Sequence, residues 1–155
     1  MLHNNLIIIS GGQTGADRAA LDFAIEYGFL HAGWCPKSRL AEDGPLEEIY
    51  KLNETPSKRY EQRTEWNVKD SDGTVIFNLT KILTGGTLFT KLCAERKNKP
   101  YLVLSKETCQ EPAQDLLAFI KEHKIQKINI AGPRGSKEPT IYDFVYNVLK
   151  MSLLS

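Results

Sequence analysis

Short apolar runs alternate along the chain with longer stretches in which apolar and polar residues recur at helical spacing. The apolar runs cover residues 6–9, 29–34, 74–77, 101–104 and 128–131. Continuous runs rich in β-branched residues are typical of strands buried on both faces, as in a parallel sheet. The stretches at residues 16–27, 84–98, 112–123 and 140–153 are predicted to be helices. Residues 59–69 are also predicted to be helical, although their apolar periodicity is poor. The stretch at residues 140–153 has the clearest apolar stripe, from Ile141 to Leu149.

Strands that alternate with helices pair in parallel through right-handed crossovers. The sequence therefore predicts an α/β fold, a Rossmann-like three-layer sandwich with about five mainly parallel strands and helices on both faces. No linker, low-complexity tract or repeat divides the 155 residues, so we expect one ligand-binding domain over residues 1–155. Residues 45–50 are expected to form a short helical turn, and Gly28 is expected to end the first helix in a left-handed conformation.

Three of the predicted strands lead into glycine-containing loops, and a parallel sheet brings these loops to one edge, where ligands bind in such folds. Glycines let backbone N–H groups touch an anion, and the start of a helix adds unpaired donors. One such loop can be a simple turn, but three together predict a site for an anionic, nucleotide-like ligand. The candidate binding residues in these loops are Ser10, Gly11, Gly12, Gln13, Thr14, Gly15 and Asp17, then Thr84, Gly85, Gly86 and Thr87, and finally Gly132, Pro133, Arg134 and Ser136.

The first loop and the residues after the second strand exclude two common phosphate-binding motifs. A P-loop requires GxxxxGK[ST], whereas Gly15 is followed by Ala16 and Asp17. A dinucleotide fingerprint requires GxGxxG and an acidic residue after the second strand. Lys37 and Arg39 follow the second strand instead. We expect them to neutralise a phosphate, the alternative being that they belong to a solvated loop.

Some single residues allow two interpretations. Asp17 either places a favourable charge at a helix N-terminus or orients a ligand. Arg18 is expected to face solvent or to pair with an acid such as Asp22, and Trp66 is expected in the core. Cys35 has no histidine predicted beside it, so no catalytic residue is predicted.

Composition narrows the possible partners. Lys and Arg number 20 and Asp and Glu 19, a net charge of +1, so we expect no broad basic surface for nucleic acid or membrane. The three cysteines and three histidines lack a metal-binding spacing, so no metal site is predicted. Neither a signal peptide nor a run of about 18 apolar residues is visible, which predicts a cytoplasmic protein.

The chain also resembles a known family along nearly its whole length. The segments that carry the resemblance are residues 7–22, 33–37 with Arg39 and 41–44, 63–68 with 70–74, 84–87, and 131–134 with 136–139. They resemble the molybdenum carrier family, which is related to molybdenum cofactor carrier proteins. That family belongs to the Rossmann-like superfamily that includes the lysine-decarboxylase-like phosphoribohydrolases.

The resemblance implies a Rossmann-like fold, usually a homo-oligomer (dimer or tetramer), with a small phosphorylated ligand over the glycine loops. The family name suggests molybdenum cofactor (molybdopterin) as cargo, with another phosphate-bearing nucleotide as the alternative. The phosphoribohydrolases carry PGGxGTxxE, in which the glutamate performs the glycosidic chemistry. Here no acid follows Thr87 at that spacing, which argues against hydrolysis of a nucleoside monophosphate.

Three functions are compatible with these observations. The first is a non-catalytic binding protein for a phosphorylated, nucleotide-like cofactor, of the molybdenum cofactor carrier or storage type. The second is a small nucleotide hydrolase or transferase that uses Asp17 or Glu42 as acid or base, and the third is a nucleotide sensor read by a protein partner. Three glycine loops without a recognisable nucleophile and base favour the first.

Overall fold

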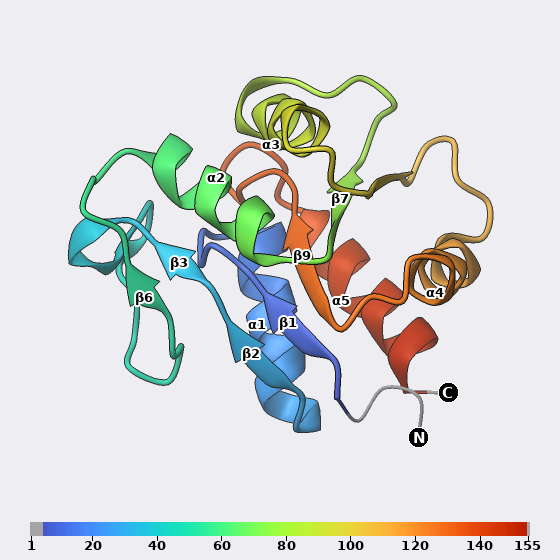
Figure 1. Cartoon of the computed structure of the whole chain (residues 1–155), viewed down its shortest axis with the longest axis horizontal. Coiled ribbons are helices and arrows are strands. Elements are labelled where there is room, and N and C mark those ends of the chain that lie inside the picture. Colours follow the sequence, from blue (N-terminus) through green and yellow to red (C-terminus); the bar gives the residue numbers. More distant parts are fainter. Residues whose placement is uncertain (1–4, 155) are drawn as a thin grey trace.

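The structure, a computed structural model, describes residues 5–154 and is built on a five-stranded parallel sheet (Figure 1). Its strands are β1 (Ile7–Ile9), β2 (Leu30–Ala32), β7 (Gly73–Asn78), β8 (Tyr101–Ser105) and β9 (Lys127–Ala131). They lie in the order β2-β1-β9-β7-β8, and every neighbouring pair is parallel. β7 lies inside the sheet and is buried along its whole length, as its continuous apolar run predicts.

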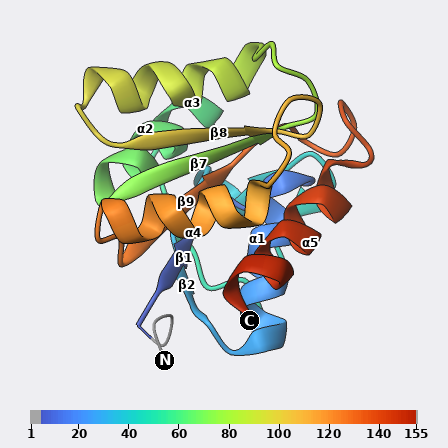
Figure 2. The same ribbon diagram turned by 90° about the vertical axis from the view of Figure 1, so that its right-hand side faces the viewer.

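Helices cover both faces of the sheet and complete three layers (Figure 2). On one face lie α1 (Ala16–Tyr27), α4 (Pro112–Glu122) and α5 (Ile141–Leu153), in which α5 packs against both α1 and α4. On the other face α2 (Tyr60–Asp70) packs against α3 (Gly85–Arg96). The predicted α/β class and Rossmann-like sandwich are confirmed.

The strand order is that of a Rossmann-like sheet whose chain begins at a different strand. If β9 is counted first, followed by β1, β2, β7 and β8, the order across the sheet becomes 3-2-1-4-5. This order reverses between β9 and β7, because β1 and β2 continue to one side of β9 whereas β8 continues to the other side of β7. Ligands bind beside the carboxyl ends of strands at such a reversal, so the fold alone marks β7 and β9 as the site's position.

The main core lies between the sheet and the layer of α1, α4 and α5. Phe23 of α1 and Phe77 of β7 are completely buried there. The stripe predicted on the last helix is confirmed, since Ile141, Val145 and Leu149 are also completely buried. Burying one side chain of this size contributes about 1.5–3 kcal/mol, so this layer holds α5 to the sheet.

The connection between β2 and α2 departs from the predicted elements. The predicted strand at residues 29–34 breaks at Gly33, which has a φ of 139°, and β3 (Trp34–Cys35) then pairs with β6 (Asn53–Glu54). The helical turn expected at residues 45–50 is wrong, because a 3-10 helix, η1 (Lys37–Arg39), leads into a hairpin of β4 (Leu40–Ala41) and β5 (Gly44–Pro45). The Arg39 guanidinium donates to the carbonyl groups of residues 46, 47, 50 and 52 and so organises this segment. A single turn remains within it, closed by the Tyr50 N–H, which donates to the Glu47 carbonyl at 3.1 Å.

The prediction that Trp66 lies in the core is wrong. Trp66 is half-buried on α2, and its ring meets the ring of Trp34 edge to face at a centroid distance of 4.7 Å. Trp34 Nε1 donates to Asp70 Oδ2 at 2.7 Å, and the side chain of Asn67 makes two hydrogen bonds to the Trp34 backbone. These contacts join β3 to α2 and so fix the position of α2 relative to the sheet.

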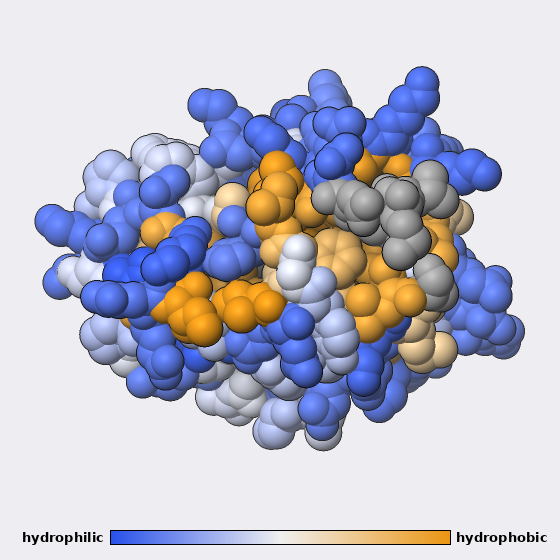
Figure 3. Space-filling view, turned by 90° about the horizontal axis from the view of Figure 1, so that it is seen from below, coloured by the Kyte–Doolittle hydropathy of each residue, from blue (hydrophilic) through white to orange (hydrophobic). Residues whose placement is uncertain are grey.

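The surface carries apolar side chains among hydrophilic ones on the face seen from below (Figure 3). Among the large apolar residues of the described chain, Leu30 at the start of β2 is 60% exposed and Met151 in α5 is 70% exposed. No helix within residues 5–154 is both long enough and apolar enough to span a membrane.

Gly28 ends α1 in the left-handed conformation that the sequence predicts, with a φ of 73° and an N–H that donates to the Ala24 carbonyl. Apart from the neighbouring residues in the chain, no atom of the described residues lies within 4 Å of the place where a Cβ would be, so a side chain would cost only the strain of the left-handed backbone. We expect Gly28→Ala to lower the free energy of unfolding by about 1 kcal/mol. Urea denaturation measures this, and Gly28→Asn should lose less, because asparagine tolerates this conformation. An unchanged denaturation midpoint for Gly28→Ala would contradict the expectation.

Candidate functional site

A cleft of about 420 Å³ lies at the carboxyl ends of β7 and β9, where the strand order reverses. This volume is within the range of small-molecule sites. Of the predicted binding residues, the cleft is lined by Gly11, Gln13, Asp17, Gly85, Gly86, Thr87, Gly132, Pro133 and Arg134. Sequence reasoning did not select several others, among them Tyr60, Arg63, Phe89 and Lys137. The three loops therefore meet as expected, and α2 adds a wall that was not expected.

The backbone amides of the first glycine loop bond to the protein itself. Gly12 N–H donates to Ser10 Oγ at 3.2 Å, and Gln13 N–H donates to Asp17 Oδ2 at 3.3 Å. Thr14 N–H donates to Gln13 Oε1 at 3.0 Å, and Ser10 Oγ donates to the Asp17 carbonyl at 2.8 Å. The N–H groups of residues 12–14, which we expected to face a phosphate, are thus already paired.

Two glycines of this loop make room for protein neighbours rather than for a ligand. A Cβ on Gly11 would lie 2.0 Å from Arg63 Nη1, and a Cβ on Gly15 would lie 2.5 Å from the carbonyl oxygen of Pro133. Ala16 N–H, at the start of α1, also donates to that Pro133 carbonyl at 3.1 Å. Close approach does explain these glycines, but the approaching groups are an arginine and a backbone carbonyl.

Asp17 and Arg63 form a buried ion pair in the wall of the cleft. Arg63 Nη1 donates to Asp17 Oδ2 at 3.0 Å, and the two side chains are 11% (Arg63) and 10% (Asp17) exposed. Burial raises the pKa of Asp17, while the Arg63 charge and the Gln13 N–H oppose that rise. Arg63 Nε is buried and has no hydrogen-bond partner among the described residues. An unpaired buried donor is costly. Because Arg63 also lines the cleft, it is a candidate binding residue.

Glu42 lies between the first and third glycine loops and accepts hydrogen bonds from both. Ser136 N–H and Ser136 Oγ donate to its carboxylate at 3.0 and 2.6 Å, Thr14 Oγ1 donates as well, and Arg134 Nε lies 3.5 Å from Oε2. Desolvation works against ionisation, but these hydrogen bonds and the Arg134 charge hold the pKa of Glu42 below its usual range. We call Thr14, Arg134 and Ser136 the Glu42 cradle. Thr14 and Ser136 were expected to contact a ligand, and here they bind a carboxylate of the protein.

The amino end of α3 forms another part of the cleft. The helix begins with Gly85, Gly86 and Thr87, and the preceding Thr84 makes no side-chain cap hydrogen bond. The first N–H groups of a helix have no intrahelical acceptor, and the helix dipole places a partial positive charge there. Lys137, from the third loop, reaches this end and its Nζ donates to Thr84 Oγ1 at 2.6 Å. A cation and unpaired helix donors therefore meet in the cleft.

Gly86 is a glycine that the fold does not require. Its φ is not positive, and within residues 5–154 no atom beyond its chain neighbours and the adjacent helix backbone lies within 4 Å of the place where a Cβ would be. Glycine in a helix costs about 0.5–1 kcal/mol relative to alanine. Because Gly86 lines the cleft, the open space beside it is available to a ligand.

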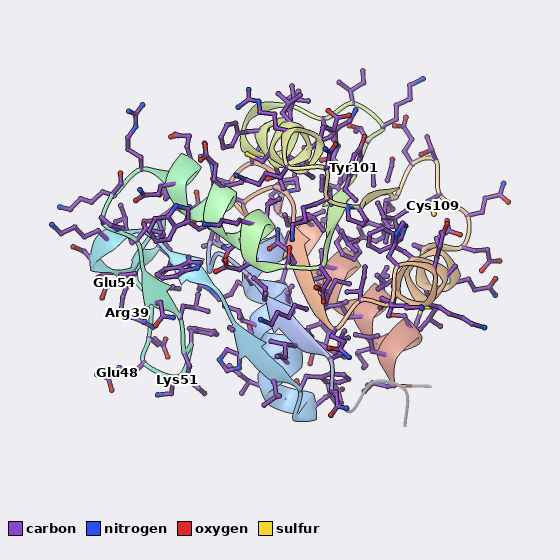
Figure 4. All side chains as sticks on the ribbon, viewed as in Figure 1. Arg39, Glu48, Lys51, Glu54, Tyr101 and Cys109 are labelled. Carbon is purple, nitrogen blue, oxygen red and sulfur yellow. The ribbon has the colours of Figure 1, made fainter. Side chains whose placement is uncertain are left out.

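Lys37 and Arg39 do not line the cleft, contrary to the expectation from the sequence. Figure 4 shows Arg39 at the left of the view, near Glu48 and Lys51. Its guanidinium is fully engaged with the carbonyl groups of residues 46–52, and Lys37 is exposed in η1. Both cations lie in η1, before the β4–β5 hairpin, and the bonds of Arg39 hold its guanidinium to the segment after that hairpin instead of to the glycine loops.

Arg18 is paired with Asp43 rather than with Asp22. Arg18 Nη1 lies 2.9 Å from Asp43 Oδ2, and Arg18 also donates to the Gly12 carbonyl. Asp22 instead accepts hydrogen bonds from the hydroxyls of two tyrosines, at positions 50 and 142. The Arg18–Asp43 pair ties the β4–β5 hairpin to α1 next to Glu42.

Two aromatic side chains complete the lining of the cleft. Tyr60 of α2 and Phe89 of α3 are half-buried there, and the Arg63 guanidinium lies 5.3 Å from the centre of the Tyr60 ring. Aromatic faces of this kind can stack a planar ring. Within residues 5–154, no group of three or more His, Cys, Asp or Glu side chains could hold a metal ion.

Known proteins place the chain in a family. No curated protein matches it. The crystal structure of a putative molybdenum carrier protein from Syntrophus aciditrophicus is similar, with 47% sequence identity, a TM-score of 0.92, and coverage of 95% of this chain and 94% of that chain. This likeness confirms the resemblance to a molybdenum carrier-like family. Residues 8–153 match the circularly permutated YpsA SLOG family, whose description agrees with the shifted strand order of the sheet. The chain belongs to the circularly permutated YpsA SLOG family.

Proposed function

We propose that the cleft binds a small phosphorylated, nucleotide-like molecule and that the protein carries or stores this molecule without turning it over. The observation that carries the proposal is the amino end of α3, where Gly86 leaves open space and Lys137 adds a positive charge. Helix amino ends bind phosphate because their N–H groups and dipole both favour an anion.

Basic side chains strengthen this position for an anion. Lys137 Nζ uses one hydrogen bond on Thr84 Oγ1, and an ammonium group has three donors. Arg134 also lines the cleft, and its side chain is 52% exposed. A phosphate at the start of α3 would therefore gain charge-assisted hydrogen bonds in addition to those from the helix.

Molybdenum cofactor is the cargo that we favour, with another phosphate-bearing nucleotide as the alternative. The residues present fit both ends of such a molecule: the α3 end suits its terminal phosphate, while Tyr60 and Phe89 offer faces for a planar ring system. Arg63 lines the cleft beside Tyr60 and adds a positive charge to that wall. The name of the similar protein from Syntrophus aciditrophicus, a molybdenum carrier, supports this choice. Native mass spectrometry of the purified protein would identify the cargo by its mass.

Lys137→Ala tests the phosphate site directly. We expect the affinity for inorganic phosphate and for molybdenum cofactor to fall about tenfold or more, the scale of one hydrogen bond to a charged group. Isothermal titration calorimetry measures both affinities. Lys81→Ala is the control, since Lys81 is an exposed lysine in the β7–α3 connection, which leads into the same helix, and it is not among the residues that line the cleft. Equal affinities for Lys137→Ala and the unmodified protein would argue against a phosphate at the start of α3.

A second candidate function, hydrolysis or transfer of a phosphate-bearing nucleoside, is favoured by one observation. Asp17 is a buried carboxylate with a raised pKa in the wall of the cleft, a state often found in catalytic acids and bases. Its ion pair with Arg63 also gives it a structural role. A panel of nucleoside mono- and diphosphates, followed for product formation, separates the two functions. Binding without product supports a carrier, and turnover would favour the enzyme.

The assembly and location of the protein remain predictions. We expect a homo-oligomer, a dimer or a tetramer, and a cytoplasmic location. The apolar side chains exposed on the face in Figure 3 offer contact surface for such an assembly. Light scattering coupled to size-exclusion chromatography measures the oligomeric state.

A further inference from the structure

The Glu42 cradle has the donors of an oxyanion site. It offers one backbone N–H and one hydroxyl from Ser136, a second hydroxyl from Thr14, and the guanidinium of Arg134. Backbone amides, serine and threonine hydroxyls and arginines are the groups with which proteins hold phosphate oxygens. In this cradle they hold the carboxylate of Glu42.

The Glu42 carboxylate is a fixed part of this arrangement. Glu42 N–H donates to Gln13 Oε1 at 2.9 Å, and the neighbouring Asp43 is paired with Arg18. Gly135 N–H donates to Thr14 Oγ1 at 3.0 Å, so the hydroxyl hydrogen of Thr14 is free to point at Glu42. The side chain of Glu42 is only 25% exposed. Backbone and side chain are thus both held in place.

We propose that Glu42 determines the ligand class: it fills an oxyanion position beside the cleft, next to Arg134, so the protein accepts a single terminal phosphate and excludes a diphosphate. This inference rests on the proposed phosphate site at the start of α3. Arg134 connects the two positions, because it both lines the cleft and lies beside Glu42. In a bound diphosphate, the second phosphate group would extend from the start of α3 towards Arg134. There the negative charge of Glu42 would repel it, and the Ser136 and Thr14 donors would already be paired with Glu42.

Glu42→Ala tests this oxyanion position, because it removes the internal anion and leaves the cradle donors unpaired. Acetate, at constant ionic strength, should bind this variant in place of the missing carboxylate and raise its Tm. Inorganic pyrophosphate should bind it about tenfold or more tightly than it binds the unmodified protein, the scale of one hydrogen bond to a charged group. The affinity for inorganic phosphate should change less, because the α3 end is untouched.

Glu48→Ala is the control. Glu48 is an exposed acid in the segment that follows the β4–β5 hairpin, whose turn carries Glu42, and it is not among the residues that line the cleft (Figure 4). Acetate and pyrophosphate should affect it as they affect the unmodified protein. Glu42→Gln keeps the shape of the side chain and removes its charge, so it provides a second variant if Glu42→Ala does not fold. It should also gain affinity for pyrophosphate, by a smaller factor.

Two results would overturn the inference: pyrophosphate binding to the unmodified protein as tightly as to both Glu42 variants, or no acetate binding to a folded Glu42→Ala. A third result separates the inference from the proposed function. If inorganic phosphate does not bind the unmodified protein while acetate still binds Glu42→Ala, the phosphate site at α3 fails. The single-phosphate specificity then fails with it, although the cradle is shown to hold an oxyanion.

Discussion

Replacing Gly86 with aspartate is expected to remove phosphate binding while the fold remains at least as stable. The aspartate would place a negative charge in the open space at the start of α3, where the proposed phosphate would bind. We expect the affinity for inorganic phosphate to fall roughly thirtyfold or more, because the carboxylate would occupy this space and compete for the helix N–H groups, each of which contributes about 1.5–3 kcal/mol to a charged acceptor. Repulsion between the two anions adds to this loss.

The same substitution should stabilise the helix. Glycine within a helix costs about 0.5–1 kcal/mol, and an acidic side chain in the first turn contributes about 0.3–1 kcal/mol. We therefore expect the free energy of unfolding to rise by about 1 kcal/mol. Calorimetric titration measures the affinity and urea denaturation measures the stability. Gly86→Asn is the matched control: it has the same shape without the charge and should keep more of the affinity.

The diagnostic result for Gly86→Asp is a rise in the free energy of unfolding together with a fall in the affinity for phosphate. A loss of both would mean that Gly86 is needed by the fold, which would contradict the open space around it. Unchanged phosphate binding in Gly86→Asp would place the anion somewhere other than the start of α3.

Replacing Asp17 with asparagine is expected to cause the largest loss of stability. Arg63 is 9% exposed, and Asp17 is its ion-pair partner at 3.0 Å. Removing one charge of a buried pair leaves the other uncompensated and costs about 3–5 kcal/mol. Arg63 Nε is already unpaired among the described residues, so the guanidinium has little else to stabilise it. We expect the free energy of unfolding, measured by urea denaturation, to fall by about 3 kcal/mol or more.

Two further variants isolate the cause of this loss. Glu61→Gln breaks the exposed ion pair between Arg59 Nε and Glu61 Oε2, which lie 3.7 Å apart. This variant should change the free energy of unfolding by less than about 1 kcal/mol. The double variant Asp17→Asn with Arg63→Met removes both buried charges and should recover part of the lost stability. If Asp17→Asn alone costs no more than Glu61→Gln, the buried pair does not stabilise the fold.

The secondary structure was largely readable from the sequence because it depends on local repetition. The buried run at residues 74–77 needed only its β-branched and aromatic residues to indicate an interior strand, and β7 is buried throughout. Ile141, Val145 and Leu149 indicated α5 by their helical spacing. The segment between β2 and α2 was not readable, since Arg39 organises it through carbonyl groups 7 to 13 residues away.

The candidate site was readable in position but not in detail. Parallel strands bring their following loops to one edge, so three glycine loops were enough to locate the cleft. Arg63 was missed because its stretch has poor apolar periodicity, although it belongs to a polar and aromatic group with Trp66 and Asn67 just before a strand. Lys137 was missed because nothing local distinguishes a lysine that reaches Thr84 from one in solvent.

The sequence by itself determined the α/β class, the order of the elements and the edge of the sheet where the glycine loops meet, because periodicity and turn chemistry act over a few residues. Only the tertiary structure decided which donors are left for a ligand. Glu42 accepts hydrogen bonds from the hydroxyls of Thr14 and Ser136, which are 28 and 94 residues away from it in the sequence. Arg63 donates to Asp17, which is 46 residues away from it. Whether a hydrogen-bond donor is paired depends on these long-range contacts, so only the folded chain distinguishes the open amino end of α3 from the first glycine loop, although the sequence predicted both as binding loops.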